Sequence, residues 1–130
     1  MRVLIAEDEP ITQKRLESLL SEFGACAVVD NGIAALEQYK EACKSGEYFD
    51  LIALDINMPG MDGQSVLEYI REAEMVEKSD QGVHTKIIMI TSHEDMSSVE
   101  KAFAHGCEAY INKPVNKNSL LRQLSALGLI

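Results

Sequence analysis

Five short apolar runs, each followed by a longer stretch with helical periodicity, make up most of this 130-residue chain. The runs lie at residues 3–6, 25–29, 51–54, 87–90 and 107–111. A short run that is apolar throughout is typical of a strand buried on both faces, and its alternation with helices indicates a parallel sheet. We therefore predict an α/β fold, a (βα)5 doubly wound sheet of five parallel strands. Right-handed crossovers divide the helices between its two faces.

The periodic stretches predict where the helices begin and end. The first helix begins near Pro10, a residue tolerated at the first helical position, and Gly24 is interpreted as its stop. Residues 30–32 form a turn and cap before the second helix. Residues 74–86 either extend the third helix or form a surface loop, and 79–82 favour a loop. The apolar positions at helical spacing are, helix by helix, Leu16, Leu19, Leu20 and Phe23; Ile33, Leu36 and Tyr39; Val66, Leu67, Ile70 and Ala73; Met96, Val99 and Phe103; and Leu120, Leu121, Leu124 and Leu127.

Composition narrows the class of protein. A chain of 130 residues that is 46% hydrophobic, with a mean hydropathy of -0.07, predicts one globular domain over residues 1–130. Because no apolar run approaches the roughly 20 residues that cross a bilayer, we expect a cytoplasmic protein without membrane insertion. The 21 acidic and 12 basic residues give a formal charge of -9, and no Lys/Arg cluster offsets it. We therefore expect no direct contact with nucleic acid.

The cysteines and histidines show none of the spacings that metal sites use. The three cysteines have no C-x-x-C pair, so we interpret each as a small buried hydrophobe. The histidines lack an i, i+4 pair and are expected to be solvated or capping. These residues are Cys26, Cys43, Cys107, His84, His93 and His105.

Four of the predicted strands end in complementary chemistry, and parallel strands bring these ends to one edge of the sheet. Each residue alone also fits a cap or a turn, but the full set suits a phosphoryl group beside a divalent metal. Crowded carboxylates raise one another's pKa unless a cation neutralises them, and a small set of oxygen ligands favours Mg²⁺ over Zn²⁺. The strand-end residues are Glu7 and Asp8, Asp55, Thr91 and Ser92, and Lys113 and Pro114.

Four motifs resemble, in order and context, the receiver domain of two-component response regulators. They are E-D at residues 7–8, D-I-N-M-P-G-M-D-G at 55–63, I-T-S at 90–92 and Y-I-N-K-P at 110–114. The resemblance spans nearly the whole chain, whose length is similar to that of a single-domain regulator of the chemotaxis CheY kind. It implies a flavodoxin-like sheet with strand order 2-1-3-4-5.

The resemblance also implies a phosphorylation site with a metal. Asp55 would be the phosphoacceptor and would attack a phosphohistidine on a histidine kinase or a histidine phosphotransfer domain. Asp8 and Asp55 would bind Mg²⁺ with their side chains and Asn57 with its backbone carbonyl. Glu7, where many relatives have Asp, would bind the metal directly or through water.

The phosphoryl group would be held opposite the metal. Lys113, the Thr91 hydroxyl and the Ser92 backbone amide would bind its oxygens. The resemblance suggests a cis peptide bond between Lys113 and Pro114. It further suggests that Asn57 and His93 flank the route of the water that hydrolyses the phosphate.

The resemblance implies a switch that links this site to a partner surface. Thr91 would move towards the phosphoryl group and Tyr110 would swing inward. The fourth helix, fifth strand and fifth helix would then bind a downstream protein target. The expected surface residues are Lys101, Ala104, Glu108 and Lys117.

Two other functions compete with this switch. A phosphatase of the haloacid dehalogenase type also uses a strand-end Asp, Mg²⁺ and a Lys, with an aspartyl-phosphate intermediate. However, it has a second Asp where this chain has Asn57, and it needs a longer chain. A receiver fold that binds partners without phosphorylation would not need the complete set of site residues. We therefore expect a phosphoacceptor signalling protein, not an enzyme, and the lack of a G-x-G-x-x-G loop disfavours a nucleotide cofactor.

Overall fold

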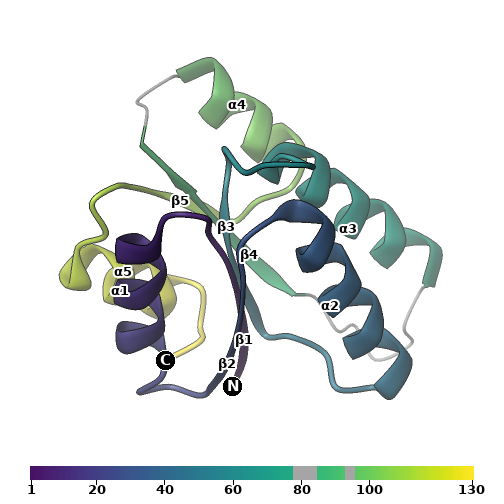
Figure 1. The fold of residues 1–130 in the computed structure, drawn as a ribbon, viewed down its shortest axis with the longest axis horizontal. Helices are drawn as coiled ribbons and strands as arrows, with labels where there is room; N and C mark the ends of the chain where they lie inside the picture. The colour runs from purple at the N-terminus through teal and green to yellow at the C-terminus, as the bar shows by residue number, and fades with distance from the viewer. Residues whose placement is uncertain (78–84, 93–95) are drawn as a thin grey trace.

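The computed structural model describes residues 1–77, 85–92 and 96–130, in which strands and helices alternate along the chain (Figure 1). The elements are β1 (Arg2–Ala6), α1 (Pro10–Leu20), β2 (Ala25–Val29), α2 (Gly32–Ser45), β3 (Leu51–Asp55), α3 (Gly63–Glu77), β4 (Lys86–Thr91), α4 (Met96–Ala104), β5 (Ala109–Asn112) and α5 (Lys117–Ala126). The prediction of five βα units is therefore confirmed.

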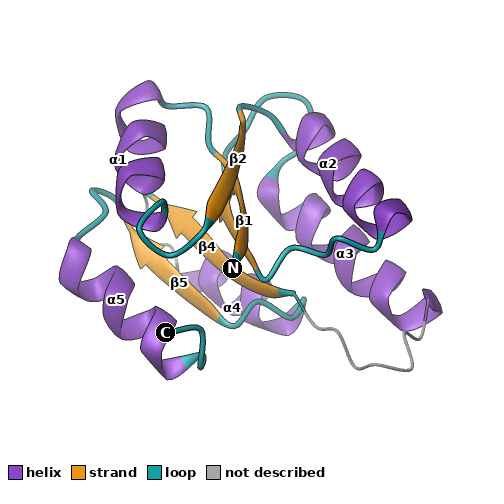
Figure 2. Ribbon diagram, turned by 90° about the horizontal axis from the view of Figure 1, so that it is seen from below, coloured by secondary structure: helices purple, strands orange, loops and turns teal. Residues whose placement is uncertain are grey.

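The sheet is parallel throughout, with the strand order β2-β1-β3-β4-β5. This is the predicted flavodoxin-like order. Helices α1 and α5 cover one face, and α2, α3 and α4 cover the other (Figures 1 and 2). Because β1 and β3 are neighbours at the centre, the loops that follow them lie side by side at the carboxyl edge of the sheet.

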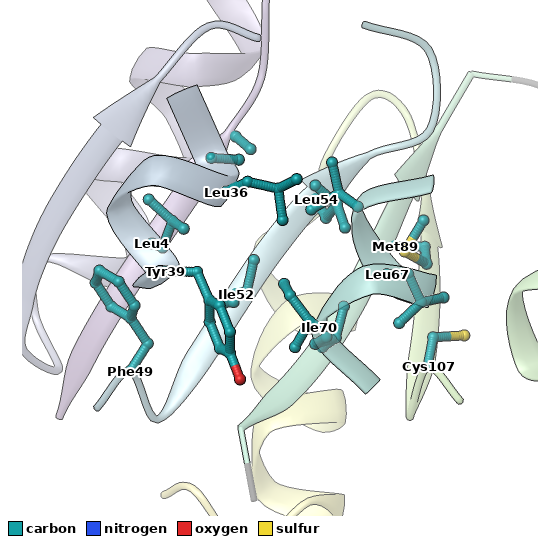
Figure 3. Packing of buried hydrophobic residues seen from close by; sticks show 14 of the residues in the cluster. Leu4, Leu36, Tyr39, Phe49, Ile52, Leu54, Leu67, Ile70, Met89 and Cys107 are labelled. Carbon is teal, nitrogen blue, oxygen red and sulfur yellow. The ribbon is translucent and has the colours of Figure 1, made fainter. Parts of the chain in front are cut away.

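Each central strand contributes side chains to both faces, because successive residues of a strand point in opposite directions. On β3, Ile52 and Leu54 pack under α2, α3 and α4, whereas Leu51 and Ala53 pack under α1 and α5. Figure 3 shows Leu36 beside Leu54 in the first of these clusters. Burying each large aliphatic side chain stabilises the fold by about 1.5–3 kcal/mol. Two-sided burial explains why these runs lack a polar alternation.

The ends of α2 follow the predicted capping chemistry. The side chain of Asn31 accepts a hydrogen bond from the Ala34 backbone N–H at 2.8 Å. At the other end, Gly46 adopts a left-handed conformation with φ 74°, which glycine tolerates best. The cap predicted within residues 30–32 is therefore confirmed at Asn31, and Gly46 ends the helix.

The first helix ends earlier than predicted. It begins at Pro10 as expected but ends at Leu20, so Gly24 is not its stop. A Cβ atom at Gly24 would lie 1.8 Å from the Met1 carbonyl oxygen. Glycine is needed there because the N-terminal backbone passes close by.

Three predicted apolar or strand positions differ in the structure. Ile33 is 54% exposed, because Gly32 takes the buried first position of α2, where the Met61 carbonyl approaches too closely for a Cβ atom. Phe103 is 45% exposed and lies edge-to-face with Tyr110, with 6.0 Å between ring centroids. The last strand, β5, spans residues 109–112 and not 107–111.

The third helix continues to Glu77, so residues 74–77 extend it. Residues 78–84 lie outside the described part of the chain, as do His84 and His93. No described helix combines the length and the hydropathy that a bilayer-spanning segment requires.

Candidate functional site

The predicted site residues meet at the carboxyl edge of the sheet. Glu7 directly follows β1, and Asp55 is the last residue of β3. Thr91 ends β4, and Lys113 directly follows β5. The parallel topology alone accounts for this meeting, because all of these strands point the same way.

Three carboxylates form the centre of the site. Glu7 is fully buried, Asp55 is 2% exposed and Asp8 is exposed. One oxygen from each lies within 4.8 Å of the other two. Apart from the ammonium of Lys113, which lies 2.9 Å away, no donor of the described residues reaches the buried Oε1 atom of Glu7. Hard oxygen donors at this spacing fit a divalent cation such as Mg²⁺, which would relieve the repulsion among them.

The pKa of Asp55 reflects this crowding. Burial, followed by the neighbouring carboxyl of Glu7, raises the pKa of Asp55 to about 7. The ammonium of Lys113 and the backbone N–H of Asn57 act in the opposite direction. The Asn57 N–H donates to Asp55 Oδ1 at 3.2 Å. Asp55 therefore sits where its negative charge is unfavourable without a further cation.

Lys113 connects the carboxylates across the edge. Its Nζ atom lies 2.9 Å from Glu7 Oε1, 2.9 Å from Glu9 Oε1 and 3.2 Å from Asp55 Oδ2. Burial acts to lower the pKa of Lys113, but the contacts with Glu7 and Glu9 and the charge of Asp55 raise it above its ordinary value. The same contact, with a hydrogen bond from Thr12, lowers the pKa of Glu9.

Glu9 is a site residue that the sequence analysis missed. It stands at the N-cap position of α1, where an acid is ordinarily interpreted as a cap, but its side chain makes no cap hydrogen bond. Its position directly after the acidic pair was the available signal.

The loop after β3 is wrapped tightly around Asp55. The Gly63 N–H donates to the Ile56 carbonyl at 2.8 Å. A Cβ atom at Gly63 would lie 2.2 Å from the Asp55 carbonyl oxygen. Glycine at position 63 therefore allows the start of α3 to press against the end of β3 and hold Asp55 in place.

The residues expected to hold a phosphoryl group flank this loop. Thr91 is 2% exposed, and its carbonyl accepts a hydrogen bond from the Lys113 N–H at 2.7 Å. Ser92 is exposed. The peptide bond between Lys113 and Pro114 is cis. Tyr110 is half-buried and packs against the cluster under α4.

Glu108 is not a free residue of the expected partner surface. Its carboxylate accepts hydrogen bonds from Arg71 at 2.7 and 2.8 Å and from the Ile87 N–H at 2.6 Å. Arg71 also donates to the Gly106 carbonyl at 2.8 Å and to the Thr85 carbonyl at 2.8 Å. This network joins α3 to the starts of β4 and β5. Of the other predicted surface residues, Lys101, Ala104 and Lys117 are exposed.

Comparisons with known proteins agree with the fold. The response regulator receiver domain model matches residues 3–125. The "Regulator of RpoS" of Escherichia coli (strain K12) is 34% identical over 124 residues, covering 95% of this chain and 33% of that protein. The "Hybrid signal transduction histidine kinase I" of Dictyostelium discoideum is 33% identical over 120 residues, covering 92% of this chain and 7% of that protein. The chain thus spans a third or less of these curated relatives.

Solved structures show the same architecture. The "CheX-CheY-BeF3-Mg+2 complex" of Borrelia burgdorferi contains a chain that is 26% identical, with a TM-score of 0.78, covering 98% of this chain and 89% of that one. The "response regulator receiver domain protein (CheY-like)" of Methanospirillum hungatei JF-1 is 25% identical, with a TM-score of 0.77, and the match covers 97% of this chain and 91% of that one. The chain therefore belongs to the response regulator receiver domain family of two-component systems.

Proposed function

We propose that residues 1–130 act as a single receiver domain, a phosphorylation-dependent switch with Asp55 as the phosphoacceptor. The observation that carries this proposal is the buried Asp55 carboxylate, with Lys113 Nζ at 3.2 Å and the Glu7 and Asp8 carboxylates within reach of a shared cation. A cation on one side and an ammonium on the other are what a phosphoryl group needs to approach a carboxylate.

The donor is a phosphohistidine on a histidine kinase or a histidine phosphotransfer domain. One Oδ atom of Asp55 attacks the phosphorus, the P–N bond breaks, and the imidazole nitrogen keeps its electron pair. The product is an aspartyl phosphate. The names of two relatives, a hybrid signal transduction histidine kinase and a sensor histidine kinase, support a kinase as the donor.

The chain's own residues position the reacting groups. Glu7, Asp8, Asp55 and the Asn57 carbonyl would hold Mg²⁺, which when bound supplies positive charge against the phosphoryl oxygens. Lys113 neutralises the opposite side, and the Thr91 hydroxyl and Ser92 amide donate hydrogen bonds. The side-chain amide of Asn57 does not ionise and cannot act as a general acid or base, so the site suits one stoichiometric transfer more than rapid turnover.

The response would pass to the face formed by α4, β5 and α5. Movement of Thr91 towards the phosphoryl group would let Tyr110 move further inward from its half-buried position. Exposed residues of this face, among them Lys101 and Lys117, would then contact a downstream protein target. Phosphorylation would favour that partner only to the extent that the phosphoryl group binds one of the two conformations more strongly.

Intact-mass measurement tests the proposal. With Mg²⁺ and a small phosphodonor, the protein is expected to gain one phosphoryl group. The gain should be lost in Asp55→Ala and with a chelator, but kept in Asp30→Ala, which changes an exposed acid near the site. A phosphoryl group that persists in Asp55→Ala would place the phosphoacceptor elsewhere.

A further inference from the structure

Glu9 holds the Lys113 ammonium from outside the buried carboxylate cluster. Its Oε1 atom accepts a hydrogen bond from Lys113 Nζ at 2.9 Å and another from the Thr12 hydroxyl at 3.0 Å. The Glu9 side chain is 58% exposed, whereas those of Glu7 and Asp55 are 0% and 3% exposed. Of these three carboxylates, only that of Glu9 can turn into solvent without disturbing packed neighbours.

The ammonium of Lys113 has no spare capacity in this arrangement. It carries three N–H donors, and three carboxylate oxygens already lie within 3.2 Å of it. A phosphoryl group on Asp55 brings new oxygen acceptors to the same place. One existing contact must then be lost. Loss of an exposed ion pair costs little, whereas a buried carboxylate left without its cation costs much more.

We propose that Glu9 is a positioning residue that occupies Lys113 in the resting protein and is displaced when a phosphoryl group arrives. This inference rests on the proposed function. The Glu9 carboxylate places a negative charge 2.9 Å from the ammonium that the phosphoryl group needs, and it competes for that ammonium. Glu7 and Asp55 keep Lys113 in place without it. Glu9 therefore slows phosphorylation and weakens the hold on the phosphoryl group.

Glu9→Gln tests this role, because it removes the charge and keeps an oxygen that can accept from Thr12. With Mg²⁺ and a small phosphodonor, we expect phosphorylation to be about two- to fivefold faster, the range that corresponds to an exposed ion pair. Binding of beryllofluoride with Mg²⁺, measured by calorimetry, should tighten by a similar factor. Glu9→Ala should change both quantities in the same direction, so that a folding defect in one variant cannot imitate the result.

Two controls separate Glu9 from general effects of charge. Glu17→Gln removes the same charge from an exposed position on the same helix and should leave both quantities unchanged. In a Lys113→Ala background, Glu9→Gln should lose its effect. An effect that persists in full there would mean general repulsion and would overturn the proposal.

The outcomes distinguish this inference from the proposed function. If the wild type is phosphorylated on Asp55 but the Glu9 variants react at the same rate or more slowly, the role given to Glu9 is wrong and the switch stands. If the wild type takes up no phosphoryl group, the proposed function is wrong and the role of Glu9 is lost with it.

Discussion

At the scale of single residues, the buried Asp55 makes the stability of the metal-free protein depend on pH. Its pKa is raised to about 7 in the folded protein, against about 3.9 in an unfolded chain. The folded protein therefore holds a proton on Asp55 more tightly than the unfolded chain does. The penalty for the ionised carboxylate is complete above pH 7 and disappears as the pH falls towards 4.

Asp55→Asn should consequently stabilise the metal-free protein, by about 1–3 kcal/mol at about pH 8. The gain should shrink through the range between about pH 7 and pH 5, where wild-type Asp55 takes up its proton. Urea unfolding in the presence of a chelator, repeated across this pH range, measures the free energy of unfolding of both proteins. Asp30→Asn, which changes an exposed acid, should show no such pH dependence. A gain that is constant from pH 5 to 8 would contradict the raised pKa.

Most residues of the site could be predicted from the sequence because each stands at the end of an apolar strand. Asp55 and Lys113 needed only the βα pattern and the rule that parallel strands end at one edge. Glu9 could not be predicted in the same way. Its role depends on a side-chain contact with Lys113, 104 positions away in the chain. The contact between Glu108 and Arg71 could not be predicted for the same reason, since Arg71 lies 37 residues before Glu108.

At the scale of the elements, the junction of β3 and α3 requires glycine at position 63, because there is no space for a side chain there. A Cβ atom at Gly63 would meet the backbone oxygen of Asp55, so Gly63→Ala is expected to cost more than about 2 kcal/mol. At Gly46 the surroundings are open and only the φ of 74° opposes a side chain, so Gly46→Ala should cost about 1 kcal/mol. Urea unfolding compares the two variants. Equal costs would show that the loop can relax around residue 63.

A second prediction concerns the attachment of α3 to β5. Arg71 is 13% exposed and pairs with Glu74 and Glu108, whose side chains are 17% and 16% exposed. Arg71→Met removes the paired hydrogen bonds to the Glu108 carboxylate and those to the Gly106 and Thr85 carbonyls, so it is expected to destabilise the fold by about 2–4 kcal/mol. The exposed Arg122 on α5 is the matched control, with an expected change within about 0.5 kcal/mol. Urea unfolding measures both variants. If they lowered the free energy of unfolding by similar amounts, the Arg71 network would make no specific contribution to stability.

The helices show why apolar spacing predicts elements better than it predicts burial. The spacing placed α2 and α4 correctly, because a helical period survives whichever face is buried. Burial also depends on what lies opposite. The loop after β3 approaches α2 at Gly32 and leaves Ile33 exposed, and Phe103 lies on Tyr110 at the edge of α4. Neither neighbour can be located from the helix's own sequence.

At the scale of the whole molecule, the charge of -9 means that NaCl will stabilise the fold to some extent by screening repulsion. A specific cation site must therefore be separated from this general effect. A ligand that binds only the folded protein at ten times its dissociation constant adds about 1.4 kcal/mol, which is a rise of several degrees in Tm for a domain of this size.

Mg²⁺ should raise the Tm by several degrees more than NaCl of equal ionic strength does, because it neutralises Glu7, Asp8 and Asp55 together. Asp8→Asn should abolish the extra rise, since it removes one of the three grouped carboxylates. Asp30 lines a surface pocket together with Asp8 but is not one of the three grouped carboxylates, so Asp30→Asn removes the same charge and should keep the extra rise. Thermal unfolding at about pH 8, where Asp55 is ionised, measures all three proteins. If Asp8→Asn retained the extra rise, Mg²⁺ would be acting on the surface charge as a whole, and the three carboxylates would not form its site.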